Sequence, residues 1–298
     1  NWTFDKFYEI FHAQAKALYQ GGADLIIIET MESLREAKAA LLASKQIGLP
    51  VIASLSFGDH GRTSFGVVPK SGATTLDFLG ADGLGMNCGT GPQPYPDIIK
   101  TYNHWTSKPL LAEANAGDPR LEDGKAVYNL TPEEYLEDIK PGLPFLSGVG
   151  SCCGSNPEFT SILSEISPEY KGVKEPKGET GNEFITDNST VLPISGETEF
   201  KEIDIEMDEL TDLNELTSDD KVNMLHFREF SEPYSELEST LARQFLRLRS
   251  SKPLGIVTSN PELLKVFLTA STGISPVRPT GNRDSIKSVA REFGGLII

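Results

Sequence analysis

Three cysteines are the residues of this 298-residue chain whose type and spacing best suit a defined chemistry. Cys88 closes the apolar segment 84–89, and Cys152 and Cys153 close the segment 145–154. Neighbouring cysteines rarely form a disulfide with each other, because the ring is strained. Three thiolates from two strand ends can instead occupy three corners of a zinc tetrahedron and leave the fourth open, which is the mark of a catalytic site. The alternative is that the cysteines are small hydrophobic residues of the core.

Five apolar segments predict the strands that would position these cysteines. Residues with helical periodicity lie between them, and a further helix is predicted over 4–20. This alternation of strands and helices is typical of a (β/α)8 barrel, but five units are too few to close one. We therefore predict an incomplete TIM barrel. Its predicted strands are 24–29, 51–56, 84–89, 109–115 and 145–153.

Polar residues gather at the carboxyl ends of these predicted strands. They include Glu29, Asn87 and Asn115 as well as the cysteines. The carboxyl ends of parallel barrel strands form one face, where active sites are built. We therefore expect Cys88 and Cys152 to meet although they are far apart in the sequence.

Composition narrows the classes of partner. The net charge of −16 argues against nucleic acid or an anionic membrane surface, since both would be repelled. No apolar run approaches the length of about 20 residues that a membrane span needs. The sequence begins at Asn1 without the features of a signal peptide, and its three cysteines are an odd number. A reducing compartment, the cytoplasm, is the expected location.

The character of the sequence changes after about residue 170. Residues 171–250 are predicted to be an acidic linker, in which 197–220 alternates acidic and apolar residues. That run could be a disordered tether or a docking strip for a basic partner. Residues 251–298 are predicted to be a small α/β segment. Its predicted elements are the strand 254–259, the helix 260–270, the strand 274–278, the helix 284–293 and the strand 296–298.

Six short motifs together resemble the homocysteine S-methyltransferase domain, in particular its cobalamin-dependent methionine synthase branch. They are IETM at 28–31, GRT at 61–63, GMNC at 85–88, NAG at 115–117, PRLEDGK at 119–125 and GSCCG at 150–154. The family usually has glycine where Ser151 stands. The resemblance covers residues 1 to about 165 and implies a homocysteine-binding barrel domain over 1–170. Because the family's first three βα units have no counterpart, it also implies an N-terminally truncated barrel made of about the last five units.

The resemblance implies that Cys88, Cys152 and Cys153 bind Zn²⁺ and that the thiol of homocysteine takes the open position. A free thiol has a pKa near 8.5 and is mostly unreactive at neutral pH, and coordination to zinc would deprotonate it. The sulfur would then accept a methyl group to give methionine. The implied donor is methylcobalamin on a separate corrinoid-binding domain or protein, recharged from methyltetrahydrofolate.

The resemblance also gives roles to the polar strand ends. Glu29 is expected to receive the ammonium group of homocysteine, and the alternative is a solvated carboxylate or a helix N-cap. Asn87 and Asn115 are expected to orient ligands or substrate through their amides, and the alternative is that they form turns.

The segment 251–298 resembles part of a pterin-binding domain, which favours a cobalamin-dependent enzyme. Two other functions stay open at this point. A related methyltransferase that uses betaine or S-methylmethionine would share the three cysteines. A non-catalytic zinc-binding scaffold would share them as well.

Overall fold

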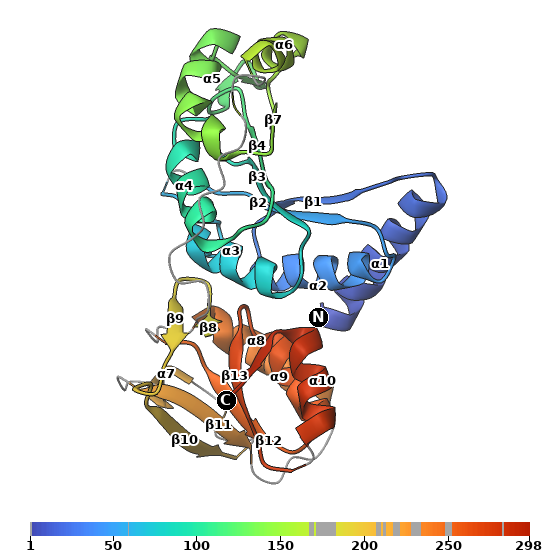
Figure 1. The fold of residues 1–298 in the computed structure, drawn as a ribbon, viewed down its shortest axis with the longest axis vertical. Helices are drawn as coiled ribbons and strands as arrows, with labels where there is room; N and C mark the ends of the chain where they lie inside the picture. Colours follow the sequence, from blue (N-terminus) through green and yellow to red (C-terminus); the bar gives the residue numbers. More distant parts are fainter. Residues whose placement is uncertain are drawn as a thin grey trace.

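The computed structural model contains two α/β units, one above the other in Figure 1. Two five-stranded parallel sheets form the centres of these units in the described part of the chain. The described residues are 2–58, 60–166, 170, 183–206, 210, 213–216, 221–227, 234–247, 252–281 and 283–298.

The first sheet confirms the five predicted parallel strands, which follow one another in chain order. They are β1 (Ile26–Met31), β2 (Val51–Leu55), β3 (Gly83–Cys88), β4 (Leu110–Ala114) and β7 (Gly148–Ser151). A small antiparallel hairpin follows β4 and comprises β5 (Arg120–Glu122) and β6 (Lys125–Val127). The helices of this unit are α1 (Phe4–Gln20), α2 (Leu34–Lys45), α3 (Pro69–Phe78), α4 (Tyr95–Trp105), α5 (Pro132–Ile139) and α6 (Pro157–Ile166), with the 3₁₀ helix η1 (Lys140–Phe145) between the last two.

Side-chain alternation gives the two faces of this sheet different properties. Ala53, Leu84 and Ala112 are fully buried and belong to the core cluster that also contains residues of the helices. The opposite face carries small and polar residues at the strand ends, while the side chain of Ile27 on β1 is 43% exposed. Parallel strands with helical crossovers are consistent with part of an α/β barrel. Among the described helices, none combines the length and apolar character that crossing a membrane requires.

The second sheet is also parallel and in chain order. Its strands are β10 (Phe200–Ile205), β11 (Val222–Phe227), β12 (Gly255–Thr258), β13 (Ser275–Pro279) and β14 (Gly295–Ile297). The helices of this unit are α7 (Leu213–Leu216), α8 (Tyr234–Arg247), α9 (Pro261–Ala270) and α10 (Arg283–Phe293). All five elements predicted within 251–298 are present.

Described parts of the range predicted as an acidic linker are folded. Strand β10 lies within the acidic run, at the edge of the second sheet, with Ile205 buried and Lys201 and Glu202 exposed. Alternation of acidic and apolar residues is here the two-residue period of a half-buried strand. The structure therefore differs from the predicted tether at these residues. Residues 171–182 of the predicted linker lie outside the described ranges.

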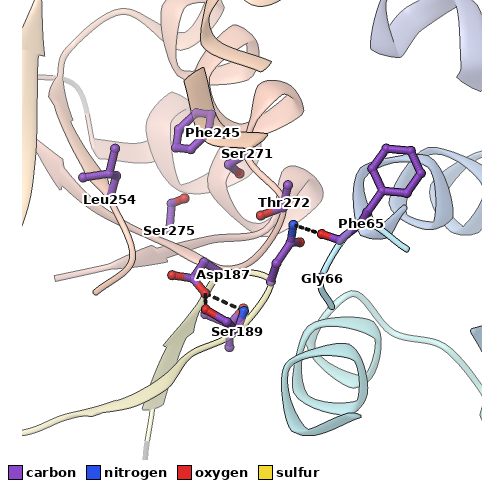
Figure 2. Close-up of a pocket in the computed structure, with 11 residues that line it drawn as sticks. Phe65, Gly66, Asp187, Ser189, Phe245, Leu254, Ser271, Thr272 and Ser275 are labelled. Atoms are coloured by element: carbon purple, nitrogen blue, oxygen red, sulfur yellow. Dashed lines mark hydrogen bonds between the residues drawn. The ribbon is translucent and has the colours of Figure 1, made fainter. Parts of the chain in front are cut away.

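An antiparallel hairpin lies between the two units and contacts both. It comprises β8 (Glu183–Thr186) and β9 (Val191–Ile194). On one side, the amide of Asn188 donates to the carbonyl of Phe65 in the first unit (3.1 Å), as a dashed line in Figure 2 shows. On the other side, the backbone N–H of Thr186 donates to the carbonyl of Ile274 (2.8 Å). Hydrogen bonds therefore attach the hairpin to both units.

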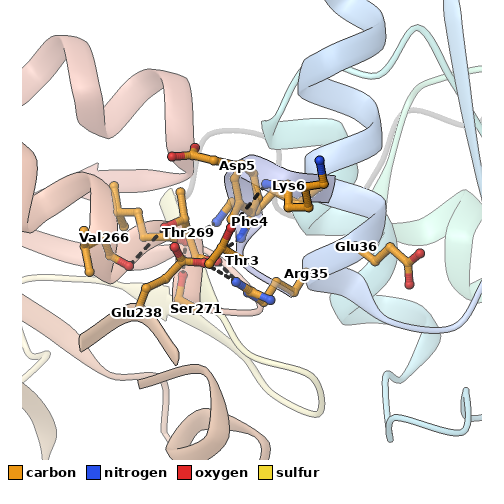
Figure 3. Close-up of polar contacts among 12 residues, drawn as sticks. Thr3, Phe4, Asp5, Lys6, Arg35, Glu36, Glu238, Val266, Thr269 and Ser271 are labelled. Atoms are coloured by element: carbon orange, nitrogen blue, oxygen red, sulfur yellow. Dashed lines mark hydrogen bonds and ion pairs between the residues drawn. The ribbon is translucent and has the colours of Figure 1, made fainter. Parts of the chain in front are cut away.

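A buried polar contact joins α1 and α2 to the second unit (Figure 3). The carboxylate of Glu238 on α8 accepts from the first backbone N–H of α1, at Phe4 (2.6 Å), and from the guanidinium of Arg35. Arg35 also donates to the carbonyl of Thr269 at the end of α9 (2.9 Å), and Lys38 donates to that of Leu268 (2.7 Å). A carboxylate at the N-terminus of α1 and the guanidinium of Arg35 at the C-terminus of α9 both interact favourably with the helix dipoles.

Candidate metal centre

The three cysteines meet at the carboxyl ends of β3 and β7, as the sequence predicts. The sulfur of Cys88 lies 3.4 Å from the sulfur of Cys152 and 3.4 Å from that of Cys153. The sulfurs of Cys152 and Cys153 are 3.9 Å apart. None of the three forms a disulfide; Cys88 and Cys152 are half-buried and Cys153 is exposed. The sulfur triangle therefore has one side open to solvent.

This triangle fits a tetrahedral zinc ion. Zinc–sulfur bonds of about 2.3 Å at tetrahedral angles place neighbouring sulfurs about 3.8 Å apart. The three measured separations lie within about 0.4 Å of that value. A set of three thiols is also a donor set that zinc prefers. The residues present thus fit a zinc ion with one coordination position left to a further ligand.

The backbone at both cysteine loops adopts conformations that only certain residues allow. Cys88 has φ +58° and is followed by Gly89 with φ +70°. The phenol of Tyr95 donates to the carbonyl of Cys88 (2.8 Å), which holds this strained residue in place. Gly154 has φ +78°, and a Cβ there would lie 2.1 Å from the ring of Tyr128. The glycine after each cysteine cluster is therefore required by the backbone and by close packing.

Asn115, predicted to orient ligands or substrate, joins the two cysteine loops. Its amide nitrogen donates to the carbonyl of Gly89 (2.9 Å), and its amide oxygen accepts from the backbone N–H of Cys153 (3.2 Å). The side chain is 4% exposed. One buried amide thus fixes the separation between Cys88 and the cysteine pair.

Asn87 is fully buried and ties together the ends of three strands. Its amide oxygen accepts from the backbone N–H of Thr30 and from the hydroxyl of Ser54, both at 2.7 Å. Its amide nitrogen donates to the hydroxyl of Thr30 (2.8 Å) and to the carboxylate of Glu29 (3.1 Å). An asparagine amide has two donors and two acceptor positions, so these bonds use all four. The arrangement lets Asn87 position Glu29.

Two residues near the centre were not predicted from the sequence. The half-buried carboxyl of Glu113 lies next to Gly150, where a Cβ would be 3.2 Å from a Glu113 oxygen. Burial, and then the negative charge of Glu29, raise the pKa of Glu113. The phenol of Tyr135 accepts from the backbone N–H of Ala114 on β4 (3.2 Å) and donates to the carbonyl of Gly150 on β7 (2.8 Å), and so joins these two strands. The sequence did offer a signal for Glu113, because it is an acidic residue among alanines at the end of β4.

The pKa values of the Cys88 and Cys152 thiols are raised, and burial is the main cause. Burial raises the pKa of Cys88, and the hydrogen bonds and charges of the two neighbouring thiols raise it further. Burial is also the largest cause of the raised pKa of Cys152. Three thiolates at this separation repel one another, and a bound divalent cation compensates that charge. The electrostatics of three neighbouring thiolates therefore favour a bound cation.

Comparison with known proteins identifies the domain around this centre. A family model described as homocysteine S-methyltransferase matches residues 1–166, more than half of the chain. The chain is 30% identical over 190 residues to methionine synthase from Mycobacterium tuberculosis (strain ATCC 25618 / H37Rv), which is 61% of this chain and 16% of that protein. It is 28% identical over 179 residues to methionine synthase from Mycobacterium leprae (strain TN), which is 57% of this chain and 15% of that protein. The chain thus spans about a sixth of the length of these curated relatives. It belongs to the homocysteine S-methyltransferase family.

Proposed function

We propose that this chain transfers a methyl group to the thiol of homocysteine at a zinc ion held by Cys88, Cys152 and Cys153. The observation that carries the proposal is the sulfur triangle, whose sides of 3.4, 3.4 and 3.9 Å suit three corners of a zinc tetrahedron. Zinc bound there would lower the pKa of the substrate thiol from about 8.5 and so make the sulfur nucleophilic at neutral pH. The exposed side of the cluster at Cys153 gives substrate access.

The remaining site residues are proposed to hold and orient the substrate. Glu29 is exposed at the end of β1, and Asn87 fixes its carboxylate by a hydrogen bond. Glu113 adds a second carboxyl close enough for the charge of Glu29 to raise its pKa. Two neighbouring carboxyls favour a cationic group, which supports the proposal that Glu29 receives the ammonium of homocysteine. Asn115 acts as a positioning residue, because its two bonds are to the cysteine loops.

We propose methylcobalamin as the methyl donor, bound by a separate corrinoid-binding domain or protein. The support is that both relatives reported above are named methionine synthases and are much longer than this chain. Methyltetrahydrofolate is the proposed source from which the corrinoid is recharged. The resemblance of 251–298 to a pterin-binding domain stays a prediction.

A methyl-transfer assay with three donors tests the proposal. The zinc-loaded chain is incubated with homocysteine and with methylcobalamin, betaine or S-methylmethionine in turn, and methionine is measured. Cys152→Ser is expected to abolish product, whereas Ser151→Gly, which restores the residue usual in the family, is expected to retain it. Product from methylcobalamin alone supports the proposed donor, and product from betaine or S-methylmethionine replaces it. Tight zinc binding without product from any donor favours the non-catalytic scaffold.

A further inference from the structure

A polar cavity lies where the hairpin β8–β9 meets the two units, away from the cysteines (Figure 2). Its volume is about 190 Å³. Phe65 comes from the first unit, Asp187 from the hairpin, and Phe245, Thr272 and Ser275 from the second unit. The cavity is therefore built by three separate parts of the chain.

Polar side chains line this cavity, and one of them has hydrogen-bonding capacity that the described residues do not use. Ser275 and Thr272, which are only 3% and 6% exposed, contribute hydroxyl groups to the lining. The amide oxygen of Asn188 is buried and has no partner within the same described set. Native proteins usually satisfy a buried polar atom with water or a ligand, because leaving it without a partner is unfavourable.

The cavity carries a negative charge. Asp187 is the one charged residue among the 11 lining residues drawn in Figure 2. One of its oxygens accepts from the backbone N–H groups of Ser189 (2.7 Å) and Thr190 (2.8 Å), and Figure 2 shows the other pointing away from these donors. Burial raises the pKa of Asp187, although the hydrogen bonds from Ser189 and Thr190 act to lower it, and the lining contains no cation to pair with this carboxylate. A ligand that brings a positive N–H donor would supply that compensation.

The walls are held in place without a ligand. The backbone N–H of Val68 donates to the carbonyl of Asn188 (2.7 Å), and the N–H of Ile274 donates to the hydroxyl of Thr186 (2.8 Å). These bonds fix the hairpin to both units, so the cavity is largely formed in advance. An occupant would contact both units at once.

We propose that this cavity is a binding site for a small primary ammonium compound that also carries a hydroxyl group. The ammonium donates to the carboxylate of Asp187 and to the amide oxygen of Asn188. The ligand's hydroxyl pairs with the hydroxyl of Thr272 or Ser275, and the aromatic ring of Phe245 borders its carbon atoms. Because the site joins the two units, its occupancy stabilises their contact.

The probe for this proposal is ethanolamine, with ethylene glycol as its neutral match. Amide chemical shifts of the full chain are recorded by NMR during titration with each compound. Ethanolamine is expected to give saturable shifts centred on the cavity, and ethylene glycol is not. Asp187→Asn keeps an oxygen for the hairpin bonds but removes the charge, so it is expected to weaken binding about tenfold or more. Asp118→Asn, an exposed aspartate elsewhere, is expected to leave the affinity unchanged.

Ser275→Ala provides a second variant that leaves the hairpin bonds untouched. It is expected to weaken ethanolamine binding severalfold while the melting temperature without ligand changes little. The proposal is overturned if ethanolamine gives no saturable shifts at the cavity, or if ethylene glycol binds equally well. It is equally overturned if Ser275→Ala and a folded Asp187→Asn both bind ethanolamine like the unmodified chain, since the cavity would then hold only water.

Discussion

Asn115→Ala tests most clearly how the fold holds the cysteine cluster together. The substitution removes the bond from the side chain to the carbonyl of Gly89 (2.9 Å) and the bond from the N–H of Cys153 (3.2 Å). A typical hydrogen bond contributes about 1 kcal/mol, so the two contribute about 2 kcal/mol. If they are needed to hold both loops at the zinc ion, the loss appears as a roughly 30-fold weaker zinc affinity. That magnitude lies within the range of about 10–100-fold found for residues that support metal ligands.

The assay is competition for zinc with a chromophoric chelator under reducing conditions, and the fold is checked by circular dichroism. Asn129→Ala is the matched control, because Asn129 is an exposed asparagine in the loop after β6. The control should bind zinc like the unmodified chain. If folded Asn115→Ala also bound zinc with unchanged affinity, the bridge between the loops would have no role in metal binding and this reasoning would be refuted.

Three further predictions concern single residues. Lys38 is fully buried and burial lowers its pKa to about 7, so between about pH 7 and its ordinary pKa of 10.5 the unfolded chain binds one more proton. Stability should therefore rise with pH in this window by up to about 1.4 kcal/mol per unit, and denaturant unfolding at two pH values should show that Lys38→Met loses this rise. Gly89→Ala would place a Cβ 2.0 Å from a backbone oxygen, whereas a Cβ at Gly124, which also has a positive φ, would meet open space. A measurement of zinc per chain should therefore show that Gly89→Ala abolishes zinc binding and that Gly124→Ala does not. Glu29→Gln should raise the KM for homocysteine about tenfold with kcat little changed, because a charge-assisted bond to the ammonium is lost; an unchanged KM would exclude that role.

Much of the first unit could be predicted because its strands are continuous apolar runs. The carboxyl ends of parallel strands lie on one face, so the cysteines at the ends of two apolar runs were expected to meet. The sulfurs of Cys88, Cys152 and Cys153 do meet. The bridging role of Asn115 could not be predicted, since its partners depend on how two distant loops pack. Glu113 was missed for the same reason.

The part between the two sheets was harder to predict from composition. The acidic residues around β10 favour a disordered tether, and only pairing of Ile203 and its neighbours with β11 makes that segment a strand. Hairpin β8–β9 contains Pro193 in a range rich in linker-type residues, and its contacts are supplied by both units. Local patterns do not report such tertiary hydrogen bonds, which decide the structure here.

The central claim is that Cys88, Cys152 and Cys153 bind one zinc ion that also accepts the substrate sulfur. The most direct measurement is zinc-edge X-ray absorption on the reduced, folded chain, with zinc content per molecule, before and after adding homocysteine. We predict one zinc per chain and a sulfur coordination number that rises from three to four with homocysteine. A folded, reduced chain that binds no zinc, or a zinc ion whose sulfur count does not change with homocysteine, would contradict the claim.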